Sequence, residues 1–272
     1  LMLTANMTLC IGALCDNGNR IVLTGDRRVS TTLDALTFKL PQPKIVIVGS
    51  FGLSFAGRPY PELTQSISRE AGKNKPGCFD EFSELVKRNY YRFREKKMEE
   101  YLLNILPPAL IANFVGGDGS YSKEELQQLL AKYNLEAEFI LSGFDSNGVG
   151  HLTRLQDDNP ATASPFDSFD SVSWLRIGAG NIASHYIANR INPSDSLNKM
   201  VYTLFSAHQH CSDTVGCISR EVDIVVLGID GSYRLNDKKI AKLKAIYKLE
   251  QRENARSLEE ALKKASDIKL LP

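Results

Sequence analysis

The sequence lacks several features that would direct it to particular classes of protein. Lysine and arginine total 33 against 32 acidic residues, so the charge balance favours neither nucleic acid nor an anionic membrane as a partner. No apolar run approaches the roughly 20 residues of a membrane-spanning helix. The five cysteines are odd in number and have no CxxC spacing, and no signal sequence precedes them. These absences predict a reduced, cytoplasmic globular protein.

The first 57 residues carry the residue patterns of β-strands and turns. A small apolar run is followed by Asp16-Asn17-Gly18-Asn19 and then by a β-branched run, which predicts a hairpin. A second pair of apolar runs flanks Gly49-Ser50-Phe51, and the nearby Pro41 and Pro43 oppose a helix there. The predicted strands occupy 9–14, 20–24, 44–48 and 52–57.

The hydrophobic period then changes from strand-like to helical. One helix is predicted along Leu63, Ile67 and Ala71, and a longer one runs from Phe79 to Phe93. The segment 92–133 is charged and interrupted by prolines and glycines, so we interpret it as a helical elaboration on the surface. Within it, Ser-Lys-Glu-Glu predicts a capped helix over 122–130.

The second half alternates strands and helices in blocks. Its predicted strands are 138–143, 151–155, 172–177, 223–229 and 232–235, and its predicted helices are 182–191 and 195–211. This order excludes a parallel βαβ fold and allows two antiparallel sheets between two helix layers, as one of several α+β arrangements. We expect a leader or mis-assigned start over 1–7, one domain over 8–237 and a C-terminal helical extension over 238–272.

Short motifs follow one another in a particular order along the chain. A threonine precedes the first strand, an Asp-x-Arg ends the second, a lysine leads the third, and an Ala-Gly ends the fourth. In this order and spacing they resemble the proteasome β-type subunits and their bacterial proteasome-like relatives, which are N-terminal-nucleophile hydrolases. The resemblance runs from Thr8 to about Leu235 and implies the four-layer αββα fold of that family. The matching segments are Thr8–Gly18, Val22–Arg28, Lys44–Val48, Phe55–Gly57, Ile140–Asp145, Ile177–Gly180 and Val225–Gly231.

The resemblance implies threonine-type endopeptidase activity with Thr8 as the nucleophile. A hydroxyl needs a base, and the α-amine of an N-terminal threonine, with a pKa of about 7.7–8.0, is suited to that task. Residues 1–7 must therefore be removed, either as a short propeptide or by methionine removal if Met7 is the initiator. The alternative is that Thr8 merely begins an edge strand.

Three further positions match the family's site. The ammonium of Lys44 would depress the pKa of the threonine amine, and the carboxylate of Asp26 would hold that lysine in place. The N–H of Gly57 would stabilise the oxyanion of the tetrahedral intermediate. Lys39 is the rival lysine because Lys39-Leu40 also resembles a family dipeptide. Arg28 is interpreted as a salt-bridge partner of loop carboxylates, and solvated or turn-capping roles remain the alternatives for Lys44 and Asp26.

Other positions depart from the family pattern. The serine expected in the family's Gly-x-Gly is replaced by Ala179, next to Gly180, and the Asp-x-x-Ser-Gly-Gly run that follows the family's fourth helix is missing. Asp213 or Ser212 would have to take its place. His208 and His210 lie two residues apart, on different helix faces, so no metal site is predicted. Cys10 is interpreted as core packing, and no cofactor is expected.

Three functions remain open from the sequence. The first is a threonine-type peptidase acting on peptides or proteins in a homo-oligomeric ring, with an ATP-dependent unfoldase as a candidate partner. The second is a catalytically silent structural subunit or binding module, and the third is an amidase of small-molecule amides. The apolar residues that favour subunit contact, unless they fold back on their own domain, are Tyr90, Tyr91, Phe93, Tyr101, Leu102 and Leu103.

Overall fold

The computed structural model describes residues 8–33, 36–41, 43–57, 60–105, 135, 137–156, 172–178, 181–214 and 218–266. The chain divides into two compact units, 1–233 and 234–272, and each is described by itself. The capped helix predicted over 122–130 lies outside the described residues.

The first unit contains two main antiparallel sheets. The order β11-β10-β2-β1-β9 forms a five-stranded sheet, and the order β5-β6-β7-β8 forms a four-stranded sheet. The strands of the first are β1 (Leu9–Cys15), β2 (Arg20–Asp26), β9 (Trp174–Gly178), β10 (Val222–Gly228) and β11 (Gly231–Arg234). Those of the second are β5 (Ile45–Val48), β6 (Phe51–Gly57), β7 (Ala137–Phe144) and β8 (Gly150–Gln156).

A separate hairpin connects the two sheets along the chain. It consists of β3 (Arg28–Leu33) and β4 (Leu36–Pro41), which pair only with each other among the described strands. The register places Arg28 opposite Pro41 and Lys39 opposite Ser30. The sequence predicts strand and turn for the first 57 residues, but it does not resolve this hairpin as an element of its own.

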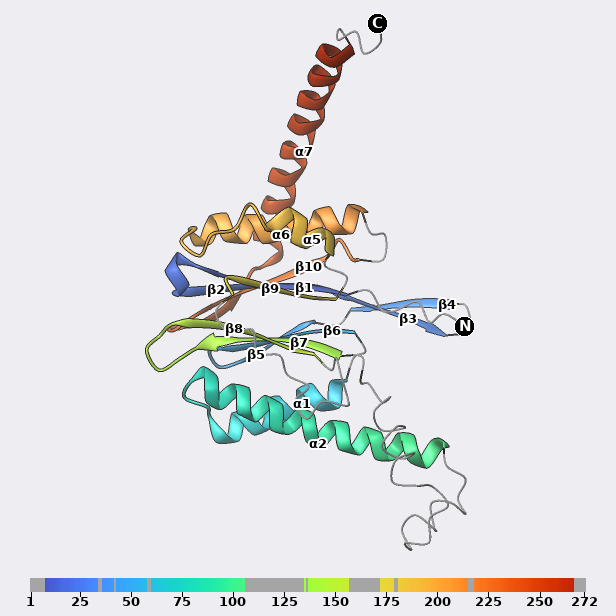
Figure 1. Ribbon diagram of the computed structural model, residues 1–272, viewed down its shortest axis with the longest axis vertical. Helices are drawn as coiled ribbons and strands as arrows, with labels where there is room; N and C mark the ends of the chain where they lie inside the picture. The colour runs from blue at the N-terminus through green and yellow to red at the C-terminus, as the bar shows by residue number, and fades with distance from the viewer. Residues whose placement is uncertain are drawn as a thin grey trace, which may run out of the picture. The chain divides into compact units, whose positions relative to one another are not determined.

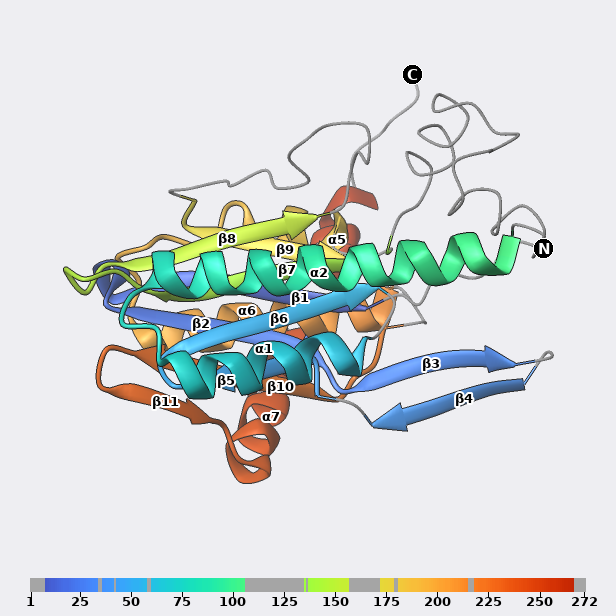
Figure 2. The same ribbon diagram turned by 90° about the horizontal axis from the view of Figure 1, so that it is seen from below.

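Helices cover the outer face of each sheet (Figures 1 and 2). The four-stranded sheet is covered by α1 (Pro61–Asn74) and α2 (Phe79–Ile105), and the five-stranded sheet by α5 (Asn181–Ile187) and α6 (Leu197–Thr214). This is the predicted α+β sandwich with four layers, and the prediction is confirmed. The second unit consists mainly of α7 (Asp237–Ser266).

Two apolar cores hold the layers together. One lies between the sheets and includes Leu23, Ile45, Ile140, Ile177 and Val225, all fully or almost fully buried. The other lies between the four-stranded sheet and the α1–α2 layer, where the Phe51 and Phe82 rings stack with centroids 4.7 Å apart. Burial of each such side chain contributes about 1.5–3 kcal/mol. The second core accounts for the helical period that the sequence shows from Leu63 onwards.

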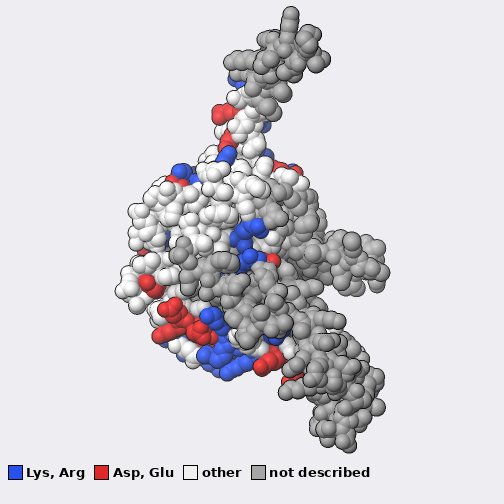
Figure 3. Space-filling view, in the orientation of Figure 1, with Lys and Arg blue, Asp and Glu red and all other residues white. Residues whose placement is uncertain are grey.

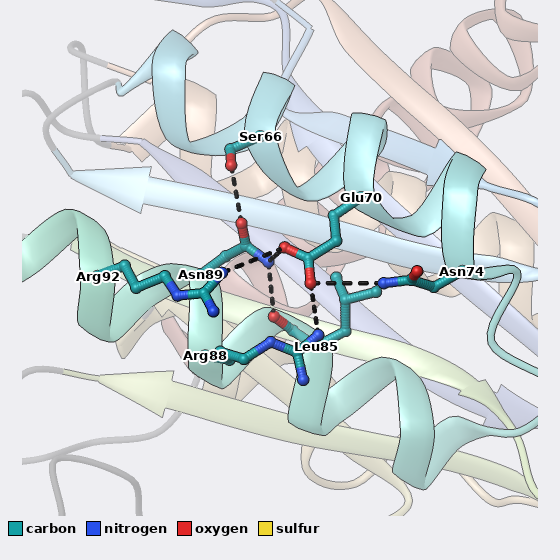
Figure 4. A network of polar contacts seen from close by, with 7 residues as sticks. All are labelled: Ser66, Glu70, Asn74, Leu85, Arg88, Asn89 and Arg92. Carbon is teal, nitrogen blue, oxygen red and sulfur yellow. Dashed lines mark hydrogen bonds and ion pairs between the residues drawn. The ribbon is translucent and has the colours of Figure 1, made fainter.

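A polar network fastens α1 to α2 (Figure 4). The Glu70 carboxylate accepts hydrogen bonds from Arg88 and from the Asn89 side-chain amide, the latter at 2.7 Å, and Asn89 Oδ1 in turn accepts from Ser66 Oγ at 2.7 Å. The hydrogen bond from Arg88 is the main reason that the pKa of Glu70 is lowered. Arg92 lies 3.9 Å from the same carboxylate. The charges at the start of the predicted elaboration therefore belong to α2, which continues to Ile105.

Acidic and basic side chains lie beside one another over the α1–α2 layer in the face that Figure 3 shows. This mixing agrees with the near-zero net charge of the chain. No helix among the described residues is long and apolar enough to cross a membrane.

The aromatic residues of α2 divide between the core and the surface. Tyr90 is buried and meets Phe139 edge to face at 6.0 Å, and Phe93 meets Tyr60 edge to face at 5.1 Å. Tyr91 and Tyr101 are more than one third exposed. Some of the apolar residues that were expected to contact other subunits therefore pack in the core of their own chain.

His208, in the middle of α6, is fully buried, and neither ring nitrogen has a hydrogen-bond partner within the described part of the chain. Burial lowers the pKa of His208 from 6.5 to about 4. The unfolded chain therefore binds this proton below about pH 6.5, whereas the folded chain does so only below about pH 4. Folding stability should fall by up to about 3 kcal/mol as the pH drops through this window.

We expect His208→Met to remove this part of the pH dependence, because methionine of similar volume carries no titratable group. The measurement is the free energy of unfolding in urea at about pH 7.5 and about pH 4.5. The loss between the two pH values should be smaller in His208→Met than in the wild type. His185→Gln, at an exposed position, serves as the control and should keep the wild-type loss. An equal loss in wild type and His208→Met would contradict the prediction.

Candidate active site

The candidate site forms where the ends of the two sheets meet. Thr8 immediately precedes β1 of the five-stranded sheet, and Lys44 immediately precedes β5 of the four-stranded sheet. Lys44 Nζ donates a hydrogen bond to Thr8 Oγ1 at 3.1 Å, and both residues are buried, with exposed fractions of 0% and 2%. The carbonyl of Lys44 accepts the Phe55 N–H at 3.0 Å, which fixes the lysine to β6. The predicted nucleophile and lysine are thus in direct contact.

The charge of Lys44 is set by two opposing effects. Burial is the larger effect and lowers the pKa of Lys44 below its ordinary value, while the carboxylate of Asp26 partly opposes it. Asp26, at the end of β2, is itself buried, and its Oδ1 accepts the Leu9 N–H at 3.1 Å. A carboxylate beside a buried ammonium favours the charged form of both groups. Asp26 therefore stabilises the Lys44 ammonium and also holds the peptide that follows Thr8.

Cys10, two residues after Thr8, lies in the core between the sheets, as expected. Its Sγ donates to the Phe55 carbonyl at 3.4 Å. Burial first, and then the Asp26 carboxylate, raise the pKa of this thiol far above its ordinary value. Because the thiolate is the reactive form of cysteine, this buried thiol is poorly suited to act as a nucleophile. The four described cysteines are all free thiols.

A glycine that the sequence interpretation missed forms the wall beside Thr8. Gly178 ends β9 opposite Leu9 with φ +78°, and a Cβ built on it would lie 1.9 Å from the Thr8 carbonyl oxygen. The same Cβ would lie 3.2 Å from that of Ala56. The signal available in the sequence was the first glycine of Gly178-Ala-Gly180, but the interpretation selected the two residues after it. Ala179 and Gly180 themselves lie outside the described residues.

Gly57 ends β6 directly after Ala56, with φ +86°, a conformation that favours glycine. It lies opposite Ala137 of β7. Because a Cβ on Gly178 would lie near both Ala56 and the Thr8 carbonyl, this end of β6 is on the same side of the molecule as Thr8. The N–H of Gly57 is the predicted oxyanion donor, and that role stays a prediction.

The remaining predicted residues form other contacts or are not described at side-chain level. Arg28 and Lys39 belong to the β3–β4 hairpin, and nothing is described of their side chains. Asp213 forms an ion pair with Arg220 at 2.9 Å near the end of α6. Ser212, the other candidate, is buried and donates to the Ile218 carbonyl at 3.1 Å. Among the residues that the structure describes, no three His, Cys, Asp or Glu side chains gather into a metal site.

Comparison with solved structures relates this fold to known proteins. A structure titled "Anbu (ancestral beta-subunit) from Yersinia bercovieri" matches with a TM-score of 0.59, and Anbu from Hyphomicrobium sp. strain MC1 matches with 0.60. Both are 12% identical in sequence, and the matches cover 97% of this chain and 99–100% of the other. A Gly-1 mutant of the Hyphomicrobium protein matches equally well, with 0.59. The chain therefore shares the fold of these Anbu structures.

These matches correct the resemblance drawn from the sequence. The expected relatives were the proteasome β-type subunits and their bacterial proteasome-like relatives. The similar structures are instead Anbu proteins, which are proteasome-like but form a distinct family. An identity of 12% shows the fold alone, so the chain is not assigned to either family. No protein-family profile matches the sequence, and no curated protein does.

Proposed function

We propose that this protein is an N-terminal-nucleophile hydrolase that cleaves amide bonds with Thr8. The observation that carries the proposal is the 3.1 Å hydrogen bond from the buried Lys44 ammonium to Thr8 Oγ1. Burying a lysine costs several kcal/mol unless nearby groups compensate it, so such a pair is unusual as a purely structural feature. Perturbed ionisable groups of this kind gather at functional sites.

The chemistry assigns a role to each group around Thr8. With Thr8 as the first residue, its α-amine takes the hydroxyl proton while Oγ1 attacks the substrate carbonyl carbon. The Lys44 ammonium depresses the pKa of that amine and stabilises the developing alkoxide, and Asp26 keeps Lys44 charged. The N–H of Gly57 is proposed to donate to the oxyanion.

The reaction is completed in two further steps. Collapse of the tetrahedral intermediate breaks the carbon–nitrogen bond, and the amine of Thr8 returns its proton to the leaving nitrogen. Water then attacks the acyl ester, releases the acid and restores the hydroxyl of Thr8. We propose peptides as substrates, in preference to small acyl amides, because the fold is shared with Anbu, which is titled an ancestral beta-subunit.

The direct requirement of this mechanism is a free amine on Thr8. In a chain that retains residues 1–7 the nitrogen of Thr8 is an amide, which is not a base. We expect protein made to begin at Thr8 to hydrolyse fluorogenic peptides, and protein that retains 1–7 without further processing to be inactive. Intact mass verifies the start of each sample. Equal turnover by both forms, or turnover of small acyl amides alone, would contradict the proposal as stated.

A further inference from the structure

We infer that Glu138 is a positioning residue that holds Gly178 against the peptide of the candidate nucleophile Thr8. Its expected effect on turnover rests on the proposed function, whereas the contacts that carry the inference do not. Glu138 lies in β7, which supplies none of the site groups considered above.

The candidate site depends on the distance between the two sheets. Thr8 and Asp26 lie at strand ends of the five-stranded sheet, and Lys44 and Gly57 at strand ends of the four-stranded sheet. A small change in the spacing of the sheets would therefore separate Oγ1 from Nζ. Misplacement of reacting groups by about 1 Å can reduce a rate about 10²-fold. A polar contact that fixes this spacing beside Thr8 is thus expected to affect catalysis.

Glu138 forms such a contact. It pairs in register with Ala56 of β6, and its Oε2 accepts the N–H of Gly178, in the other sheet, at 3.2 Å. Gly178 lies opposite Leu9, and its Cα faces the Thr8 carbonyl so closely that no side chain fits between them. One carboxylate therefore connects the four-stranded sheet to the backbone that packs on Thr8.

A guanidinium holds the carboxylate in this position. Arg154 Nη2, from β8, lies 3.1 Å from the same Oε2, and both side chains are about one third exposed. The pKa of the neighbouring Arg176 is lowered by burial and by the charge of Arg154, and the carboxylate of Glu138 opposes this effect. A charged acceptor makes stronger hydrogen bonds than a neutral one. The carboxylate is thus fixed between a guanidinium and the backbone that it positions.

The Thr8–Leu9 peptide is consequently held from two sides. Asp26 accepts the Leu9 N–H at 3.1 Å, and Gly178 packs against the carbonyl of Thr8. Asp26 acts within its own sheet, whereas Glu138 acts across the gap between the sheets. The two carboxylates therefore restrain the same peptide in different directions.

The test compares Glu138→Ala, which removes the acceptor, with Glu138→Gln, which keeps it. In protein that begins at Thr8, we expect kcat to fall about 10²-fold in Glu138→Ala. We expect a fall of no more than about five-fold in Glu138→Gln. KM should change by less than about two-fold in both, because the residue acts on the enzyme backbone. Glu84→Ala, which removes an exposed glutamate paired with Lys87, is the control and should retain the wild-type kcat.

A second readout does not depend on hydrolysis. The Gly178 amide should be protected from hydrogen exchange, measured by NMR, in the wild type and in Glu138→Gln, and should exchange at least about ten-fold faster in Glu138→Ala. If Glu138→Ala does not fold, Arg154→Met, which frees the carboxylate, should shift exchange in the same direction. Unchanged kcat and unchanged exchange at Gly178 would overturn the inference.

The two proposals can fail separately. Hydrolysis that persists in Thr8→Ala would remove the proposed function, and exchange at Gly178 would then decide the role of Glu138 alone. Hydrolysis that requires Thr8 but is indifferent to Glu138→Ala would remove only the positioning role.

Discussion

Replacing Lys44 with methionine is expected to reduce amide hydrolysis by at least about 10²–10³-fold, the usual cost of losing one preorganised charge-stabilising group. Lys44 Nζ is the donor in contact with Thr8 Oγ1, and methionine fills similar space without the charge. The measurement is kcat/KM for a fluorogenic peptide, using protein that begins at Thr8. Lys39→Met is the matched control and should keep most of the activity. The reverse ranking would move the site to Lys39.

The same variant should also reveal the coupling between Lys44 and Asp26. Lys44→Met leaves a buried carboxylate without its cation, which costs about 3–5 kcal/mol when the remaining charge is not relieved. Adding Asp26→Asn keeps an acceptor for the Leu9 N–H and removes that charge. We therefore expect the double variant to be more stable than Lys44→Met by about 1–3 kcal/mol in urea unfolding. Strict additivity of the two single changes would show that the charges do not interact.

The second large effect is expected from Gly178→Ala. The new Cβ would lie 1.9 Å from the Thr8 carbonyl oxygen, and the φ of +78° is one that alanine rarely adopts. Overpacking and backbone strain each cost about 1–3 kcal/mol, so folding stability should fall by roughly 2–6 kcal/mol. Activity should fall as well, because the clash displaces the peptide of the nucleophile.

Gly49→Ala isolates the contribution of the clash. Gly49 also has a positive φ, +63°, but a Cβ there would meet no atom within 4 Å. The free energy of unfolding of Gly49→Ala should therefore fall only by the cost of the backbone conformation, about 1 kcal/mol, and the variant should keep its activity. Free energies of unfolding for the two variants provide the comparison. A loss in Gly178→Ala no larger than that in Gly49→Ala would contradict the close approach to Thr8.

The sequence predicted the elements that local patterns determine. Alternation and turn residues located the two hairpins of the first 57 residues, and the spacing of Leu63, Ile67 and Ala71 marked α1 because these residues face one core. The end of α2 was misjudged, because its charged residues from Arg92 onwards suggested a surface elaboration. Arg92 in fact lies against Glu70 of α1, and such an interhelix contact leaves no local signal.

The candidate site was predictable only in part. The sequence selected Thr8, Asp26 and Lys44 because each stands at a strand end that the motifs mark, and the structure places Lys44 Nζ against Thr8 Oγ1. Gly178 and Glu138 were missed because their importance arises from contacts across the sheets, 40 residues apart in sequence. The motifs also misdirected the family assignment. Glycines and strand starts are demanded by the fold itself, so they cannot separate families that share it.

The most direct test of Thr8 as nucleophile is the site of covalent modification by a threonine-directed electrophile. Protein that begins at Thr8 should gain the mass of one adduct, and peptide mapping should place the adduct on Thr8, with none formed in Thr8→Ala that remains folded. Lys44→Met should form the same adduct at least about 10²-fold more slowly. An adduct on Cys10 or another residue, with Thr8 unmodified while peptides are still hydrolysed, would contradict the account.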